Sequence, residues 1–248
     1  MRVAALYDIH GNMPALESVL ADVRTEAVDA IVIGGDIVPG PMPREVIDAV
    51  RALDVPVHCI KGNCEVAVLA ARSNEPMSAN LPEQAREAMR WTAREIDDAD
   101  AQWFASWPMT LRFEMPGIGP TLFCHGTPQS EVEIFLRTTP EERLRSRFDD
   151  LGVNLVVCGH THMQFDRMVG GLRVVNAGSV GMPFGTTGAD WLMLGPGIDL
   201  RKTNYDTTAA AEIFRRTEYP MVEEMAVRYI LNPPTEQELF AAWAPAEV

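Results

Sequence analysis

The sequence predicts an α/β protein built from two sheets with helices around them. Its 248 residues are 47% apolar and 23% charged, the composition of a globular protein with a large core. In the first third, short apolar runs alternate with amphipathic stretches, as strands alternate with helices. From residue 109 onward the pattern is strand-rich and predicts a second sheet. We expect one domain over residues 1–206 and a C-terminal helical tail over residues 207–248.

The first elements alternate in type along the chain. Strands are expected over residues 3–7, 30–33 and 55–60, because each is a short apolar run. Helices are expected over residues 13–26 and 43–53, where apolar residues recur at helical spacing. Each of these strands ends in a polar cluster. Since ligands collect outside the carboxyl ends of strands in open α/β sheets, these clusters are candidate site residues.

Residues 66–107 are mostly helical in pattern, with a polar break at residues 73–80. They include Trp91, Trp103 and Trp107. We expect these helices to pack beside the sheet, and a lid over the site is the alternative.

The second half is expected to hold six strands. They cover residues 110–114, 121–124, 155–158, 165–169, 172–176 and 191–194. Gly170 and Gly171 form a tight hairpin between two of them. Residues 208–231 are again helical in pattern, and Asn232 starts a short tail that packs either on the same subunit or on a second one. A homodimer therefore remains an open alternative.

The charge of the chain excludes one class of partner. With 21 Lys and Arg against 35 Asp and Glu, the net charge of −14 provides no basic field for long nucleic acids. A small phosphorylated substrate stays compatible, because bound cations can reverse the local potential. No stretch approaches the roughly 18 uninterrupted apolar residues of a membrane span. The four cysteines lack C-x-x-C spacing and are interpreted as reduced thiols, so a cytoplasmic location is expected.

Five short polar clusters follow predicted strands. They are Asp8-Ile9-His10-Gly11-Asn12, Gly35-Asp36, Gly62-Asn63-Cys64-Glu65, His125-Gly126 and Gly159-His160-Thr161-His162. Carboxylate, carboxamide and imidazole groups suit divalent transition metals, and the scarcity of cysteine argues against a closed thiolate zinc site. In extended chain, residues i and i+2 point the same way, so the Asp8–His10 and His160–His162 pairs can each face one cavity. Together the clusters predict a metal site.

The histidine distribution supports this prediction. The chain has five histidines, and four of them lie within the clusters. The fifth, His58, sits inside an apolar strand and is interpreted as a structural residue. Each cluster alone is common in proteins, so the prediction depends on finding all five in this order, each closing a strand.

The ordered set resembles the calcineurin-like metallophosphoesterases, whose pattern is D-x-H, G-D, G-N-H-[DE], H and G-H-x-H. The resemblance spans about residues 3–195, and the D-I-H-G-N opening is most similar to small bacterial and archaeal phosphodiesterases. It implies a layered α-β-β-α sandwich, with two packed mixed sheets flanked by helices. It also implies hydrolysis of phosphodiester or phosphoanhydride bonds in small, nucleotide-like substrates through attack of a metal-bridging hydroxide.

The resemblance also assigns the ligands. Two divalent transition-metal ions are implied, with manganese expected first and iron, zinc, nickel or cobalt also compatible with these ligand types. Asp36 would bridge the two ions. One ion would take Asp8, His10 and His162, and the other Asn63, His125 and His160.

The candidate catalytic residues are Asn63, Cys64 and Asn12. Asn12 is similar to a residue that faces the substrate phosphate in this branch. Cys64 stands where many members carry a histidine assigned to leaving-group protonation. A thiol has a pKa of about 8.5 and forms only weak hydrogen bonds. Cysteine at this position therefore implies a leaving group that needs little protonation, or an acid supplied by another residue.

Three other functions are considered. A Ser/Thr protein phosphatase is disfavoured, because Gly35-Asp36 is followed by Ile37-Val38-Pro39-Gly40 instead of the Asp-Arg-Gly of that class. A binding module without turnover would be signalled by replaced ligands, and all seven are present here. A dinucleoside polyphosphate hydrolase would use the same metals, and the sequence does not separate it from a phosphodiesterase.

Overall fold

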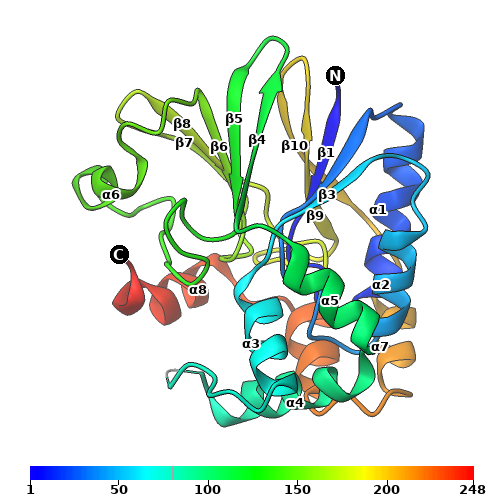
Figure 1. Cartoon of the computed structure of the whole chain (residues 1–248). Coiled ribbons are helices and arrows are strands. Elements are labelled where there is room, and N and C mark those ends of the chain that lie inside the picture. Colours follow the sequence, from blue (N-terminus) through cyan, green and yellow to red (C-terminus); the bar gives the residue numbers. More distant parts are fainter. Residues whose placement is uncertain (80) are drawn as a thin grey trace.

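The computed structural model describes residues 1–79 and 81–248 and shows two five-stranded sheets packed face to face (Figure 1). Sheet A has the order β10-β9-β1-β2-β3, and sheet B the order β4-β5-β6-β8-β7. The strands of sheet A are β1 (Val3–Leu6), β2 (Ala30–Ile33), β3 (Val57–Cys59), β9 (Ala189–Leu194) and β10 (Ile198–Thr203). Those of sheet B are β4 (Thr110–Met115), β5 (Gly119–Cys124), β6 (Leu155–Cys158), β7 (Phe165–Val169) and β8 (Leu172–Asn176).

Both sheets are mixed. In sheet A, β1, β2 and β3 run parallel, and β9 is antiparallel to both of its neighbours. In sheet B, β5, β6 and β8 run parallel, and the edge strands β4 and β7 are antiparallel. The parallel strands deliver their carboxyl ends to one edge of the sandwich, which is the lower edge in Figure 1. The predicted α/β sandwich with two packed mixed sheets is therefore confirmed.

The core follows the two-residue alternation of the strands. Ala5 and Tyr7 of the first strand segment face sheet B, where they meet Phe123 and Val157 in the layer between the sheets. Leu6, from the same segment, belongs to a second cluster with the helices outside sheet A. The Tyr7 hydroxyl donates to the Val157 carbonyl at 3.2 Å, so its one polar atom is satisfied inside the sandwich.

Helices cover the outer faces and the lower edge. Sheet A is covered by α1 (Met13–Thr25), α2 (Pro43–Arg51) and α5 (Asp98–Ser106), and sheet B by α6 (Glu141–Phe148). Below the strands lie α3 (Asn63–Arg72), α4 (Glu83–Glu95), α7 (Thr207–Phe214), the π-helix η1 (Glu224–Leu231), α8 (Glu236–Trp243) and the short η2 (Ala244–Ala246).

Of the helices over residues 66–107, α5 packs beside sheet A, as predicted, whereas α3 and α4 lie below the strands. Met89 and Ala93 of α4 join the cluster outside sheet A, and Ala88 packs against α7 and η1. Asn80, the last residue of the predicted polar break, lies outside the described residues. In the described parts of the chain, no helix has the length and apolarity that a bilayer crossing requires.

Three elements differ from the sequence prediction. The edge strand β10 was missed because its only strong apolar residues are Ile198 and Leu200. The helix α6 was also missed, because six of its eight residues are polar. The helix expected over residues 208–231 is divided into α7 and η1, and Pro220 lies between them, where it prevents helix continuation.

Candidate metal centre

The seven predicted ligands lie together below the carboxyl ends of parallel strands. The segment after β1 supplies Asp8 and His10, and the segment after β2 supplies Asp36. Asn63 is the first residue of α3, just after β3. The segments after β5 and β6 supply His125 and the pair His160 and His162. Each parallel strand of the sandwich except β8 therefore brings at least one candidate ligand.

One group of ligand atoms is formed by Asp8, His10 and His162. The Nε2 atoms of the two histidines are 3.1 Å apart. The Asp8 Oδ1 atom lies 3.9 Å from His10 Nε2 and 3.3 Å from His162 Nε2. All three side chains are buried. Their donor atoms point to one small volume, which is the arrangement that a single cation requires.

A second group adjoins the first. His125 Nε2 lies 3.4 Å from Asp36 Oδ2, 3.7 Å from Asp8 Oδ1 and 3.1 Å from Asn63 Oδ1. The His160 ring lies beside the His125 ring, with centroids 5.1 Å apart. Asp36 also belongs with His10 to a group of potential ligands within 4.8 Å of one another. Asp36 is therefore placed between the two histidine groups.

The backbone of the ligand segments is unusual. Asp8, His10, Asp36, His160 and His162 all have positive φ, between 49° and 67°. Residues other than glycine rarely adopt this left-handed backbone conformation, and such strain is concentrated at functional sites. Backbone hydrogen bonds hold the segments together, including Asp8 N–H to Gly35 O at 3.1 Å and His10 N–H to Asp36 O at 3.0 Å.

Hydrogen bonds to the backbone orient two of the imidazoles. His125 Nδ1 bonds the Gly34 carbonyl at 2.8 Å, and His162 Nδ1 bonds the Met182 carbonyl at 3.0 Å. Because a carbonyl only accepts, each Nδ1 donates a proton to it, and each Nε2 atom is directed toward the other candidate ligands. Metal-binding histidines commonly have such an outer partner.

Burial and neighbouring charges shift the pKa values of three of these histidines. Burial, with help from His162, lowers the pKa of His10 to about 4. Burial and His125 lower the pKa of His160 to about 3. Burial also opposes the charged form of His125, but the Asp36 and Asp8 carboxylates outweigh it and raise its pKa to about 10. Without a bound cation, His125 is thus the main positive partner of two buried carboxylates.

The residues present fit a divalent cation. Among the described residues, Asp8 Oδ1 and His160 Nε2 are buried and have no hydrogen-bond partner. Leaving such atoms unpaired costs free energy, so a buried carboxylate oxygen and an imidazole nitrogen without partners point to a missing electrophile. The mixed oxygen and nitrogen donors match first-row transition metals.

Two supporting residues were not assigned from sequence. The buried Glu65 carboxylate accepts from the backbone N–H groups of Asp36, Ile37 and Gly62 at 2.8–2.9 Å, which fixes the Asp36 segment against the start of α3. Glu65 is the last residue of the polar cluster Gly62–Glu65, and this position in the sequence could have indicated its supporting role. The Asn176 amide donates to the Gly159 carbonyl at 2.6 Å, and it follows no cluster that could have indicated it.

The side chains of Cys64 and Asn12 form hydrogen bonds with other groups of the protein. The Cys64 thiol donates to Asp36 Oδ2 at 2.9 Å, and its backbone N–H donates to Asp36 Oδ1 at 2.9 Å. Burial, and then the Asp36 carboxylate, raises the pKa of this thiol well above its usual value. The buried Asn12 side chain caps α1 at Ala15 N–H and donates to the Gly181 carbonyl and the Tyr205 hydroxyl.

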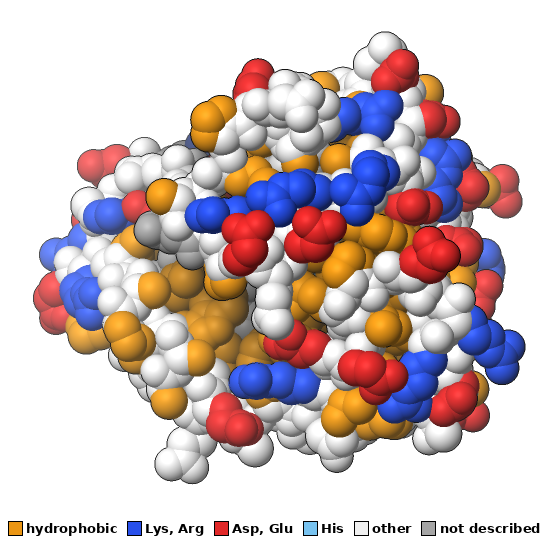
Figure 2. Space-filling view, turned by 90° about the horizontal axis from the view of Figure 1, so that it is seen from below, with side chains coloured by type: hydrophobic (Ala, Val, Ile, Leu, Met, Phe, Trp, Pro, Cys, Tyr) orange, Lys and Arg blue, Asp and Glu red, His pale blue; other side chains and the backbone are white. Residues whose placement is uncertain are grey.

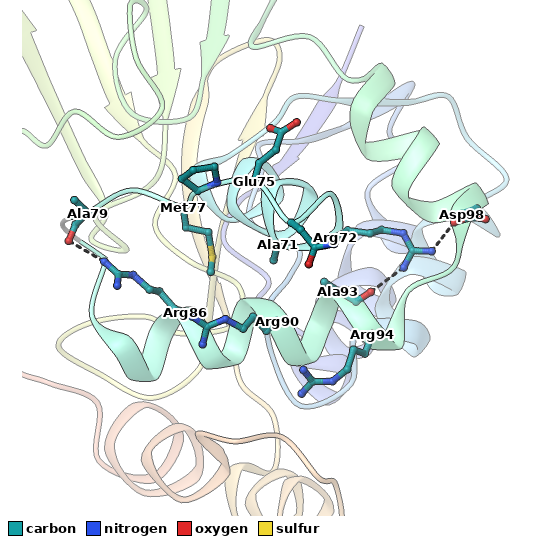
Figure 3. A pocket seen from close by; sticks show the side chains of 12 residues that line it. Ala71, Arg72, Glu75, Met77, Ala79, Arg86, Arg90, Ala93, Arg94 and Asp98 are labelled. Carbon is teal, nitrogen blue, oxygen red and sulfur yellow. Dashed lines mark hydrogen bonds and ion pairs between the residues drawn. The ribbon is translucent and has the colours of Figure 1, made fainter.

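A cavity lies away from the metal centre, between α3, α4 and α5 (Figure 3). Its volume is about 1210 Å³, and four arginines line it: Arg72, Arg86, Arg90 and Arg94. Arg72 bonds Asp98 at 2.6 Å, and the other three bond Glu83 or Glu87 of α4 at 2.9–3.4 Å. Each of these arginines is therefore already paired with a carboxylate. None of the described lining residues is a histidine, so this cavity does not offer the ligand types of the metal centre.

Comparisons with known proteins identify the family of the chain. Residues 1–194 match the family model of the calcineurin-like phosphoesterase superfamily domain. An uncharacterized protein of Methanocaldococcus jannaschii is 26% identical over 181 residues, which are 72% of this chain and 69% of that protein.

Two crystal structures share the fold. A hypothetical protein from Pyrococcus horikoshii superposes with a TM-score of 0.76 at 20% identity, over 94% of this chain and 99% of that one. A metallophosphoesterase from Sphaerobacter thermophilus gives 0.71 at 24% identity, over 91% and 98% of the two chains. At these identities the likeness shows a shared fold.

Proposed function

Because the chain belongs to the calcineurin-like phosphoesterase superfamily, whose members are metal-dependent phosphoesterases, we propose that it hydrolyses phosphodiester or phosphoanhydride bonds of small, nucleotide-like substrates. The observation that carries this proposal is the convergence of the candidate ligands, two of whose buried atoms, Asp8 Oδ1 and His160 Nε2, have no hydrogen-bond partner. A fold retained only for binding would not need this set.

The proposal assigns two divalent cations, manganese first, to the two histidine groups. Asp8, His10 and His162 hold one ion, and Asn63, His125 and His160 hold the other. Asp36 is assigned to both, which the proximity of its carboxylate to His10 and to His125 supports. Two such ions supply a nucleophilic water at neutral pH and neutralise charge on the phosphoryl group.

The exposure of the ligands indicates the side from which substrate approaches. Asn63 and His160 are partly exposed, whereas the other five ligands are buried. We therefore assign the substrate phosphate to the Asn63 and His160 side, with the Asp8 group behind it. The Cys64 thiol already donates to Asp36, so its role in this proposal is to orient that carboxylate.

Metal-reconstituted turnover tests the proposal. Protein stripped with a chelator and resupplied with Mn²⁺ is assayed on bis(p-nitrophenyl) phosphate, p-nitrophenyl phosphate and diadenosine tetraphosphate. Hydrolysis of the diester or the tetraphosphate that depends on Mn²⁺ supports the proposal and distinguishes the two substrate classes. Mn²⁺ binding without turnover of any of the three would contradict it and favour a binding module.

A further inference from the structure

The C-terminal helix α8 lies next to the metal centre. It runs below the strands, and the C-terminus lies at the lower left of the view in Figure 1. Leu239 of this helix is buried against Leu136 and Met163, with Phe240 and Trp243 packed beside it. The Trp243 ring is 5.5 Å from the ring of the candidate ligand His160, at an interplanar angle of 66°. The tail is therefore part of the site.

The tail is held in this position by bonds at both ends. Just before α8, the Gly185 N–H donates to the Pro234 carbonyl at 2.8 Å. After the helix, the Glu247 carboxylate accepts from the Thr139 hydroxyl at 2.6 Å, and Val248 N–H donates to the Ile134 carbonyl at 2.9 Å. Trp243 is thus set between two fixed points and presents its ring in a defined place.

Aromatic side chains lie beside His160 and His162. Phe184 lies 5.9 Å from the His162 ring and 6.4 Å from the Tyr229 ring, so a second aromatic side chain flanks the same centre. Trp243 itself is half-buried and keeps part of its surface free. Figure 2 views the lower face and shows that hydrophobic side chains gather there among charged ones.

We propose that Trp243 is a wall of the substrate site and selects phosphoesters that carry a planar aromatic group beside the scissile phosphate. This inference rests on the proposed function and specifies its substrate class. The phosphate lies toward Asn63 and His160, and the planar group lies against the free surface of the Trp243 ring. Stacking on an aromatic ring depends little on which base is present, so the site distinguishes planar from non-planar groups without reading base identity.

Stacking on Trp243 would also offset the repulsion between this acidic chain and a negatively charged substrate. A chain with a net charge of −14 repels phosphorylated molecules at a distance, so the ions alone must overcome this field. A stacking contact adds affinity that does not depend on charge, on the order of tenfold per base.

Equilibrium binding to the Mn²⁺-loaded protein tests the inference. Adenosine 5′-monophosphate and ribose 5-phosphate share the sugar phosphate and differ in the base, so their affinity ratio isolates the planar group. We expect the wild-type protein to favour the nucleotide by about tenfold. Trp243→Ala removes this preference while leaving the affinity for ribose 5-phosphate unchanged, and Trp243→Phe retains most of it.

Trp103 offers a matched control. It is also half-buried, but it belongs to α5 and lies beneath the Arg51 guanidinium. Trp103→Ala should keep the wild-type ratio, and thermal unfolding of each variant checks that it folds. An unchanged ratio in Trp243→Ala overturns the inference, as does an equal loss of both ligands, which would mean that Trp243 only supports His160. A wild-type protein that shows the preference but hydrolyses no diester contradicts the proposed hydrolysis while supporting aromatic selection.

Discussion

Adding one methyl group at Gly62 tests how the Asp36 carboxylate is held. Gly62 precedes α3 and has an extended backbone, with φ of −93° and ψ of 179°, so alanine is allowed there without backbone strain. An added Cβ would nevertheless lie 2.1 Å from Asp36 Oδ1 and 2.8 Å from the Asp36 backbone nitrogen. Gly62→Ala therefore acts on the candidate bridging ligand directly, without removing any ligand atom.

The size of the effect follows from this contact. To reach even 3.0 Å from the new methyl group, the Asp36 oxygen must move by about 0.9 Å. That movement stretches the bond from Cys64 N–H, which is now 2.9 Å long. Because a displacement of about 1 Å can cost on the order of 100-fold in rate, we expect that loss in kcat/KM. Overpacking should lower the free energy of unfolding by about 1–3 kcal/mol.

The assay compares Gly62→Ala with Gly197→Ala. No described atom lies within 4 Å of a Cβ built at Gly197, which sits in the turn between β9 and β10, so this variant controls for the change of residue type. Mn²⁺ affinity, kcat/KM on a chromogenic diester and thermal unfolding are measured for both. Wild-type Mn²⁺ affinity and turnover in Gly62→Ala would refute the argument that Asp36 is fixed against Gly62.

Three further predictions concern the same centre. Asp36→Asn should lower turnover by about a thousandfold or more and weaken Mn²⁺ binding, because it removes the carboxylate assigned to both ions; wild-type turnover would refute the assignment. Cys64→His removes the thiol that donates to Asp36, so it should weaken Mn²⁺ binding and change the ratio of monoester to diester hydrolysis; wild-type values of both would show that this thiol does not orient Asp36. Chelation should lower the Tm by about 5–10 °C relative to protein in Mn²⁺ at 100 times its Kd, because binding at that ratio stabilises by about 2.7 kcal/mol. A Tm that ignores Mn²⁺ would contradict a native metal site.

The sequence was sufficient to predict which polar clusters lie together, and the reason is physical. Parallel strands present their carboxyl ends at one edge, so polar clusters such as Gly35-Asp36 and His125-Gly126 could be predicted to converge without any coordinates. The residues that position the ligands leave no comparable pattern. Asn176 bonds Gly159 from the end of a different strand, a relation set by the order of strands in sheet B.

The contribution of the tail was also beyond the sequence. The pattern from Asn232 onward suggested only a short polar and apolar segment that packs on this subunit or another. In the structure Trp243 reaches His160, 83 positions earlier in the chain, and Thr139 bonds Glu247 with a separation of 108 residues. Contacts this distant depend on how the loops after β5 and β6 fold, and local spacing carries no information on that.

Contacts within the protein fix the strained backbone of the ligand segments. Left-handed φ at a residue other than glycine costs roughly 1–3 kcal/mol, and five ligand positions adopt it. Such conformations persist only where surrounding structure determines them, and here the segment after β1 is bonded to the segment after β2 at Asp8–Gly35, His10–Asp36 and Gly11–Ile37. A shift of one segment must therefore move the other. It follows that backbone hydrogen bonds hold the ligand segments relative to one another, and that a methyl group added at Gly62 should displace ligands of both histidine groups.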